Sequence, residues 1–336
     1  MSDASVLGID LAKNVFELCG QDQAGRVIYR KRLRRAQLLH TLALMPACRI
    51  GMEACAGAHH WARRLREHGH TVRLIPAQYV KPYLKGNKTD RNDAEAICEA
   101  TTRAHVPEVA IKSEAQQAIA AYHRARSLLV KQRSALGNAL RALLAEFGRV
   151  GPRGALALRS LVLAALADEA LPALLREAIQ TQWSQWLHLD ESIGQMDRQL
   201  DRLAQSEPMC RSMLEVPGIG AKTATALLAA VADARVFASG RAMAAWLGLV
   251  PRQHSSGERV QLGGISKRGD AYLRGLLIHG ARSALVRSQR DDPQLAWARA
   301  LEARRGRNKA VVALASKRAR LLWAMMSRNE PYRHAA

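Results

Sequence analysis

The sequence has few cysteines, and they form no recognisable pattern. Five cysteines are scattered through 336 residues, an odd number with no C-x-x-C pair among them. Scattered single thiols are typical of proteins from a reducing cytoplasm, whereas disulfide frameworks and zinc sites need paired or closely spaced cysteines. We therefore expect neither disulfides nor a zinc site.

Long apolar runs are also missing. A membrane-spanning helix needs about 18 or more consecutive apolar residues. The best candidate, LVLAALADEALPALL from Leu161, is interrupted by Asp168 and Glu169. Asp3 and Asp10 occupy the places where a signal peptide would have its basic start and apolar core. The sequence predicts a cytoplasmic protein that does not insert into membranes.

Acidic residues are in deficit and aromatic residues are rare. The chain has 51 Lys and Arg against 29 Asp and Glu, a formal charge of +22, and only 4% aromatic residues. Such a charge favours a polyanionic partner, most often nucleic acid. Residues 235–336 contain 20 Lys and Arg against 6 Asp and Glu, so this part carries 14 of the net charges. Few aromatics argue against base stacking and favour contacts with the phosphate backbone.

Strand-sized runs open the chain. SVLGIDLA, VFELCGQD and RVIYRKRL predict a three-stranded meander over residues 6–33. Helices are expected near 36–44 and 59–68, with a strand at Arg49–Glu53 between them; the strand TVRLIP and a helix from Lys88 follow. The order β-β-β-α-β-α-β-α is that of an RNase H-like α/β domain, a mixed sheet flanked by helices.

The middle of the chain is predicted to be helical. A helix is expected over 114–147, and after an interruption at 148–154 the helical pattern resumes and continues to about Gln205. Ile193, Met196, Leu200 and Leu203 form an apolar stripe with coiled-coil-like spacing. The stripe suits either a helix pair within one chain or an oligomerisation arm.

A helix-hairpin-helix pattern begins the last part of the chain. MLEVPGIGAKTATALLAAV, from Met213, places Gly218 and Gly220 in a turn between two helices, with Lys222 in the second. In such elements the glycines let backbone N–H groups approach a phosphate. The alternative is an ordinary turn between helices. We divide the chain into an α/β domain (1–110), a helical region (111–206) and a mostly helical C-terminal domain (207–336).

Four carboxylates are placed so that they can converge. Asp10 ends the first predicted strand, Glu53 ends the fourth, and Asp90 and Asp93 share one face of the next helix. Oxygen ligands of this kind suit Mg²⁺ or Mn²⁺. Two such ions about 4 Å apart stabilise the attacking and leaving oxygens of a phosphodiester displacement. Taken singly, each acid could instead cap a helix or face solvent.

Two blocks of sequence carry a family resemblance. LGIDLAKNVFE, IGMEACAGAHHWARRL and AQYVKPYLKGNKTDRNDAEAI resemble the RuvC-like domain of the DEDD transposases of the insertion-sequence "one-ten" family. VPGIGAKTATALLA and AAWLGLVPRQHSSGERVQLGGISKRGDAYLRGLLIHGARSAL resemble that family's second domain. PRQHSSG and GISKRGD are most similar to its "eleven-eleven" branch. The resemblance covers nearly the whole chain except the helical middle.

The resemblance implies roles for individual residues. Asp10, Glu53, Asp90 and Asp93 fall on the family's acidic tetrad, and Ser256 falls on the serine that bonds covalently to a DNA end. The neighbouring Gly257 favours Ser256 over Ser255. The family's known properties further imply a noncoding bridge RNA that pairs with donor and target DNA. They also imply a homo-oligomer, a dimer or tetramer, in which carboxylates of one subunit meet the serine of another.

Basic side chains surround the serine in the sequence. Arg252, Arg259, Lys267 and Arg268 are expected to contact phosphates, or else to form a general basic surface. A serine hydroxyl is a weak nucleophile unless a base or a metal activates it. His254 is a candidate proton acceptor, with a structural or phosphate-binding role as the alternative.

Three functions remain open at this point. The first is an RNA-guided DNA transposase or recombinase, cytoplasmic and associated with the bacterial nucleoid, that uses divalent metal and a covalent serine step. The second is a RuvC-like nuclease in which water attacks and Ser256 only binds phosphate. The third is a non-enzymatic basic nucleic-acid-binding protein whose acids are structural.

Overall fold

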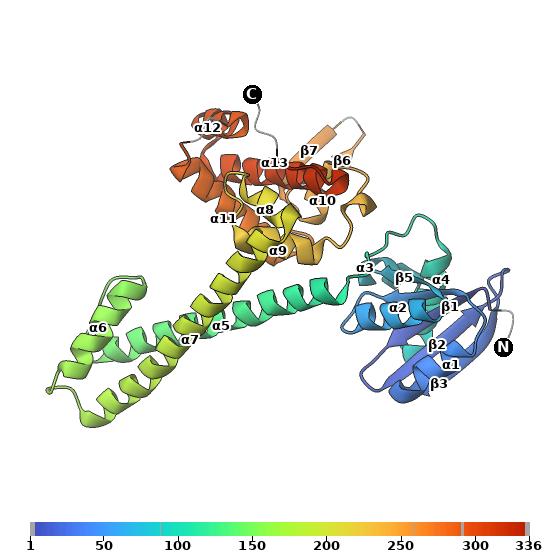
Figure 1. Ribbon diagram of the computed structural model, residues 1–336, viewed down its shortest axis with the longest axis horizontal. Coiled ribbons are helices and arrows are strands. Elements are labelled where there is room, and N and C mark those ends of the chain that lie inside the picture. The colour runs from blue at the N-terminus through green and yellow to red at the C-terminus, as the bar shows by residue number, and fades with distance from the viewer. Residues whose placement is uncertain (1–3, 88, 258, 290–291, 333–336) are drawn as a thin grey trace. The chain divides into compact units, whose positions relative to one another are not determined.

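The computed structural model describes residues 4–87, 89–257, 259–289 and 292–332 (Figure 1). The chain forms two compact units, one made of residues up to 117 together with 231–236, the other of 118–230 and 237–336. The division at residues 110 and 206 made from the sequence stays a prediction. None of the described helices is both long enough and apolar enough to cross a membrane.

A five-stranded mixed sheet forms the centre of the first unit. Its strands are β1 (Val6–Leu11), β2 (Val15–Gln21), β3 (Val27–Arg34), β4 (Arg49–Glu53) and β5 (Thr71–Ile75). Their order in the sheet is β3-β2-β1-β4-β5, with β1, β4 and β5 parallel and β2 antiparallel to both its neighbours. The predicted meander and the strand at 49–53 are confirmed, and the sheet is compatible with an RNase H-like domain.

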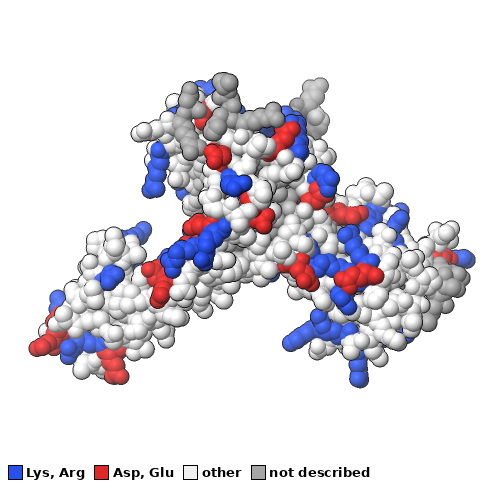
Figure 2. Space-filling view, in the orientation of Figure 1, with Lys and Arg blue, Asp and Glu red and all other residues white. Residues whose placement is uncertain are grey.

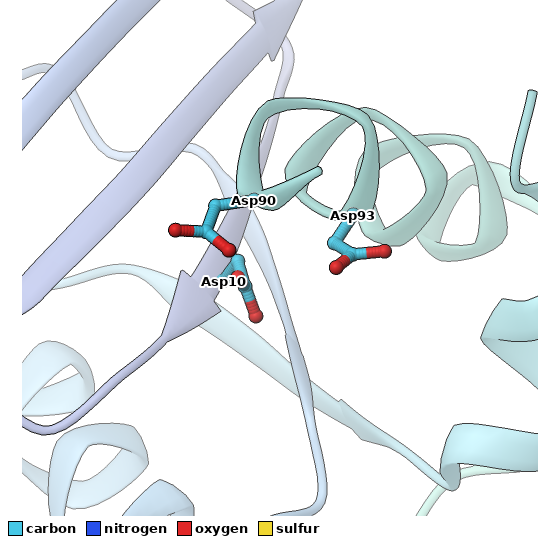
Figure 3. Close-up of side chains that lie close together, drawn as sticks. All are labelled: Asp10, Asp90 and Asp93. Carbon is cyan, nitrogen blue, oxygen red and sulfur yellow. The ribbon is translucent and has the colours of Figure 1, made fainter. Parts of the chain in front are cut away.

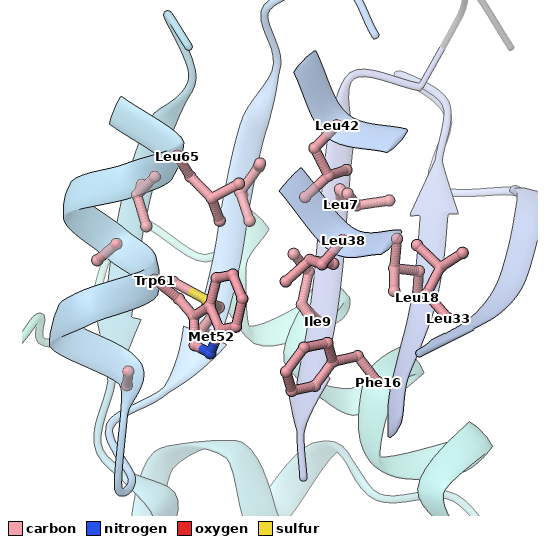
Figure 4. Packing of buried hydrophobic residues seen from close by; sticks show 14 of the residues in the cluster. Leu7, Ile9, Phe16, Leu18, Leu33, Leu38, Leu42, Met52, Trp61 and Leu65 are labelled. Atoms are coloured by element: carbon pink, nitrogen blue, oxygen red, sulfur yellow. The ribbon is translucent and has the colours of Figure 1, made fainter. Parts of the chain in front are cut away.

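One face of this sheet carries the main hydrophobic core. Side chains alternate between the two faces of a strand, and Leu7, Ile9 and Met52 point to the same side. There they pack with residues of α1 (Leu38–Ala43) and α2 (Ala58–Glu67), as Figure 4 shows. Strand residues that alternate with these core residues therefore point to the opposite face of the sheet.

Helix α4 (Asp90–Thr102) lies on the opposite face, in direct contact with the main chain of the sheet. A Cβ atom at Gly8 of β1 would overlap the carbonyl oxygen of Ala94 and the nitrogen of Cys98. A Cβ atom at Gly51 of β4 would overlap the side chain of Thr101. The two glycines therefore set the distance of α4 from the sheet. This distance fixes the first turn of α4 next to the end of β1.

The short elements between β5 and α4 were not predicted. They are α3 (Ala77–Val80) and a 3₁₀ turn, Lys81–Tyr83, the latter containing Pro82. Another 3₁₀ turn, Arg35–Gln37, precedes α1, so the helix expected near 36–44 begins two residues later as an α-helix.

Three long helices begin the second unit. They are α5 (Glu114–Glu146, which starts in the first unit), α6 (Ala155–Ala167) and α7 (Ala173–Ser206). The expectation of one helical pattern up to about Gln205 was wrong in one respect, because residues 168–172 separate α6 from α7. Pro172, which has no backbone N–H and fixes its φ, stands immediately before α7.

Helices α5 and α7 are joined by ion pairs and a shared core. Arg126 pairs with Asp197, and Arg133 pairs with Asp190. Leucines of α5 and α6 pack with the stacked rings of Trp183 and Trp186 on α7. Of the predicted apolar stripe on α7, Ile193 and Leu200 are buried within this chain. The role of the stripe in oligomerisation stays a prediction.

The remainder of the second unit consists of helices and one small sheet. The helices are α8 (Pro208–Leu214), α9 (Ala221–Ala230), α10 (Gly240–Trp246), α11 (Ala271–Arg287), α12 (Pro293–Arg305) and α13 (Arg307–Arg328). The sheet is a hairpin of β6 (Pro251–Ser256) and β7 (Arg259–Ile265). On the face shown in Figure 2, basic and acidic side chains are interspersed on each unit rather than gathered in one patch.

Candidate active site

Three carboxylates lie in a row across the α4 face of the sheet. Asp10 is opposite Glu17 in the antiparallel pairing of β1 and β2. Glu53 follows Met52, which pairs with Ile9 in the parallel pairing of β1 and β4, so the same register brings Glu53 beside Asp10. All three therefore project from the same face, at the end of the sheet where β1 and β4 finish.

Two further carboxylates come from the first turn of α4. The side chain of Thr89 caps this helix by accepting a hydrogen bond from the nitrogen of Asn92 at 3.2 Å. The capped end starts the helix at Asp90, and Asp93 lies one turn further. Oxygen atoms of Asp10, Asp90 and Asp93 lie within 4.8 Å of one another (Figure 3). Three of the four predicted tetrad residues thus converge. Glu53 is on the same face but outside that 4.8 Å group.

The crowded negative charge changes the protonation of Asp10. Partial burial, the largest cause, and the negative charges of neighbouring carboxylates together raise the pKa of the Asp10 carboxyl to about 6; the neighbours are Asp93, Asp90, Glu53 and Glu17. Carboxylates that oppose each other's ionisation are stabilised by a cation among them. Their hard oxygen donors fit a divalent ion such as Mg²⁺ or Mn²⁺.

We expect Asp10→Asn to stabilise the metal-free protein at pH above about 6. The pKa of Asp10 rises from 3.8 to about 6 on folding, so between these pH values the folded state binds more protons than the unfolded state. Stability therefore falls as pH rises through this range, and because the Asp10 carboxyl is only partly buried, solvent screening makes the loss smaller than the pKa shift alone would give. Removing the charge should raise the melting temperature of the first unit near pH 8 in EDTA, with little change near pH 4. A lower melting temperature for the variant near pH 8 would contradict the assignment.

Ser256 ends β6 at the tip of the exposed hairpin. It pairs with Arg259 across the two strands, and Gly257 after it takes a left-handed conformation with φ of 56°. By strand alternation, His254 shares a face with Ser256, whereas Ser255 lies on the other face. The Ser255 hydroxyl accepts a hydrogen bond from Gln253 at 3.0 Å. The two neighbouring serines therefore lie on opposite faces of the hairpin. The hairpin itself was not predicted from the sequence.

The basic residues predicted to contact phosphates near Ser256 lie in different local structures. Arg252 and Arg268 are exposed. Lys267 has a φ of 55°, and its nitrogen donates to the oxygen of Gly248 at 3.2 Å. A Cβ atom at Gly248 would overlap the main chain of Arg268. The GISKRGD segment therefore packs by its backbone against the end of α10, with its basic side chains at the surface.

One side of the predicted helix-hairpin-helix turn packs against helix α11. Gly218 has a φ of 87°, and a Cβ atom there would overlap the backbone of Gly280 in α11. Gly220 has open space where a side chain would be. Lys222 forms an ion pair with Asp197 at 2.9 Å. Gly218 thus has a packing role between helices, and phosphate binding by this turn stays a prediction.

Comparisons with known proteins identify transposases as relatives of this chain. Residues 7–148 match the family model of the DEDD transposases of IS110 type, and residues 210–296 match that of the transposase IS116/IS110/IS902 family. The chain is 48% identical to a probable family 20 transposase of Pseudomonas aeruginosa, over 98% of both chains. It is 44% identical to the transposase for insertion sequence element IS1111A of Coxiella burnetii, over 100% of this chain and 93% of the relative. For the IS1328 transposase of Yersinia enterocolitica the identity is 40%, over 97% of both chains.

The fold, the converging aspartates and these matches define an enzyme of the DNA transposase and recombinase class. A DEDD domain implies a divalent-metal requirement, with which the carboxylate cluster agrees. The chain belongs to the IS116/IS110/IS902 family of transposases.

Proposed function

We propose that the protein is an RNA-guided transposase that cuts and rejoins DNA with the tetrad Asp10, Glu53, Asp90 and Asp93 and the nucleophile Ser256. The observation that carries the proposal is the convergence of Asp10, Asp90 and Asp93 at the end of β1. The register of β1 and β4, in which Ile9 pairs with Met52, supports adding Glu53 as the neighbour of Asp10 on the same face of the sheet.

The four carboxylates would hold Mg²⁺ or Mn²⁺. When bound, such ions neutralise charge that develops on the attacking and leaving oxygens of a phosphodiester. The residues of the chain supply the positioning, since α4 rests on Gly8 and Gly51 and carries Asp90 and Asp93 in its first turn. We propose Mg²⁺ as the ion, with Mn²⁺ as the alternative.

Ser256 would carry the covalent step. Its Oγ bonds to phosphorus while the bond from phosphorus to one DNA oxygen breaks; the serine proton leaves and the freed DNA oxygen takes up a proton. One phosphodiester is exchanged for another ester, so the reverse attack by a DNA hydroxyl rejoins strands without an external energy source. Arg259 pairs with Ser256 across the hairpin, which supports a role in offsetting charge on the phosphate. Arg252, Lys267 and Arg268 would bind neighbouring phosphates.

Guidance by RNA can be tested by identifying the RNA that copurifies with the protein. We expect one noncoding RNA, transcribed from the element that encodes the protein, to copurify with it, with segments complementary to donor and target DNA. The measurement is sequencing of RNA recovered after purification in high salt, with the mass of the complex giving the proposed dimer or tetramer. Recovery of cellular RNA in proportion to its abundance would remove guidance from the proposal. It would leave the carboxylate and serine chemistry to be tested separately.

A further inference from the structure

A basic groove lies beside the carboxylates, between β3 and α4. It has a volume of about 350 Å³, and Glu17, Leu18, Arg30, Lys31, Arg32, Arg91 and Ala94 line it. Arg30, Lys31 and Arg32 are three consecutive basic residues of β3.

Sheet register determines how the groove is oriented. Arg32 pairs with Glu17 and Arg30 pairs with Cys19 in the ladder between β2 and β3, so both arginines face α4. Further from the carboxylates, Arg30 bonds to Glu95 of α4 at 2.5 Å. Towards them, the Arg32 Nε lies 3.2 Å from an oxygen of Glu17, which is opposite Asp10. The groove therefore leads from the Arg30–Glu95 ion pair to the carboxylate cluster.

Arg32 and Arg91, at the end of the groove nearest the carboxylates, have N–H groups available to bind a phosphate. The side chain of Arg32 is 67% exposed, and the contact with Glu17 uses its Nε, which leaves the two terminal amino groups. Arg91 is exposed, follows Asp90 in the chain, and has no ion-pair partner within the described part of the protein. A phosphate approaching the carboxylates would be repelled by them. Arginines beside the cluster supply the local attraction that brings it there.

We propose that this groove binds the phosphate backbone of the DNA strand that is cut, with Arg32 and Arg91 contacting phosphates next to the bond that breaks. The inference rests on the proposed function, because it extends the same site. RNA carries the same phosphates, and the experiment below separates the two.

A simpler role for Arg32 would be to neutralise Glu17. A double-mutant cycle distinguishes the two roles. If Arg32 binds DNA, Arg32→Gln and Glu17→Gln/Arg32→Gln each lose affinity for a short single-stranded DNA, and the slope of log K against log salt becomes shallower by about 1. Glu17→Gln alone keeps wild-type affinity or exceeds it. If Arg32 only neutralises Glu17, the double variant returns to the wild-type slope, which would overturn the proposal.

Local protection gives an independent measurement on the full-length protein in EDTA. Phenylglyoxal modification of arginines is followed by mass spectrometry with and without DNA of mixed sequence, and with RNA of the same sequence. Arg32 and Arg91 should be protected by DNA. Arg64, which is 45% exposed and paired with Glu67 at 2.8 Å on α2, is the matched control and should stay reactive.

The outcomes separate this inference from the proposed function. Unchanged reactivity of Arg32 in the presence of DNA, in a protein that still cuts DNA in a metal-dependent manner, overturns the groove alone. Protection by RNA but not by DNA also overturns it. Cutting that persists in EDTA would instead count against the carboxylate mechanism, whatever the state of Arg32.

Discussion

Replacing Asp10 with asparagine is expected to reduce DNA strand cleavage at least about 1,000-fold, equivalent to about 4 kcal/mol in the activation barrier. The substitution keeps the shape of the side chain and removes one charge from the group formed with Asp90 and Asp93. A divalent ion would then lose a ligand in the centre of the cluster. The measurement is single-turnover cleavage of DNA carrying the element's ends, together with Mn²⁺ binding by calorimetry.

Glu67→Gln is the matched control for this experiment. Glu67 is an acid of the same unit whose side chain is 55% exposed, and it lies on α2, on the other face of the sheet. Its substitution should leave cleavage and Mn²⁺ binding at wild-type levels. Glu53→Gln tests the fourth member of the tetrad and should resemble Asp10→Asn. Undiminished cleavage by Asp10→Asn would refute a catalytic role for the cluster and favour a non-enzymatic, structural role for these acids.

Ser256→Ala is expected to abolish the covalent protein–DNA species while DNA binding remains within about twofold of wild type. The hydroxyl is the only group removed, and the exposed end of β6 has no packing that depends on it. Denaturing gels would show the loss of the protein band that carries labelled DNA. Anisotropy would report binding.

Ser255→Ala provides the control on the same strand. Its hydroxyl lies on the opposite face of the hairpin and is hydrogen-bonded to Gln253. The covalent species should persist in this variant. If it is lost there and retained in Ser256→Ala, the nucleophile is Ser255. If neither variant alters strand cutting and no adduct forms in the wild type, water is the nucleophile and the protein acts as a hydrolytic nuclease.

Much of the first unit could be predicted from local sequence. Alternating apolar residues placed the meander, and β4 was predicted with the bounds it has in the structure. The convergence of Asp10 with Asp90 and Asp93 also followed, because strand ends and a helix start are local features. Glu17 could not be found in this way. Its proximity to Asp10 depends on the antiparallel register, which no single strand reveals.

Other features depend on contacts between distant residues or on weak local signals. Gly218 was predicted to approach a phosphate, yet the space beside it is filled by Gly280, more than sixty residues later. The hairpin around Ser256 was missed because its residues are almost all exposed and lack the buried face that marks a strand. The break before α7 did have a signal in Pro172, which a helix interior does not tolerate.

Helix α4 packs directly on the backbone of Gly8 and Gly51, so substitutions at these two positions should have different effects from substitutions in the main core. Side chains of the hydrophobic core lie on the other side of the sheet, so exchanges such as Met52→Leu there alter unfolding energy by less than about 1.5 kcal/mol. They leave the helix bearing Asp90 and Asp93 where it is. At the two glycines even one added methyl group displaces that helix. Substitutions of similar volume in the main core should therefore leave the carboxylate geometry intact, whereas a side chain at Gly8 or Gly51 should disturb it.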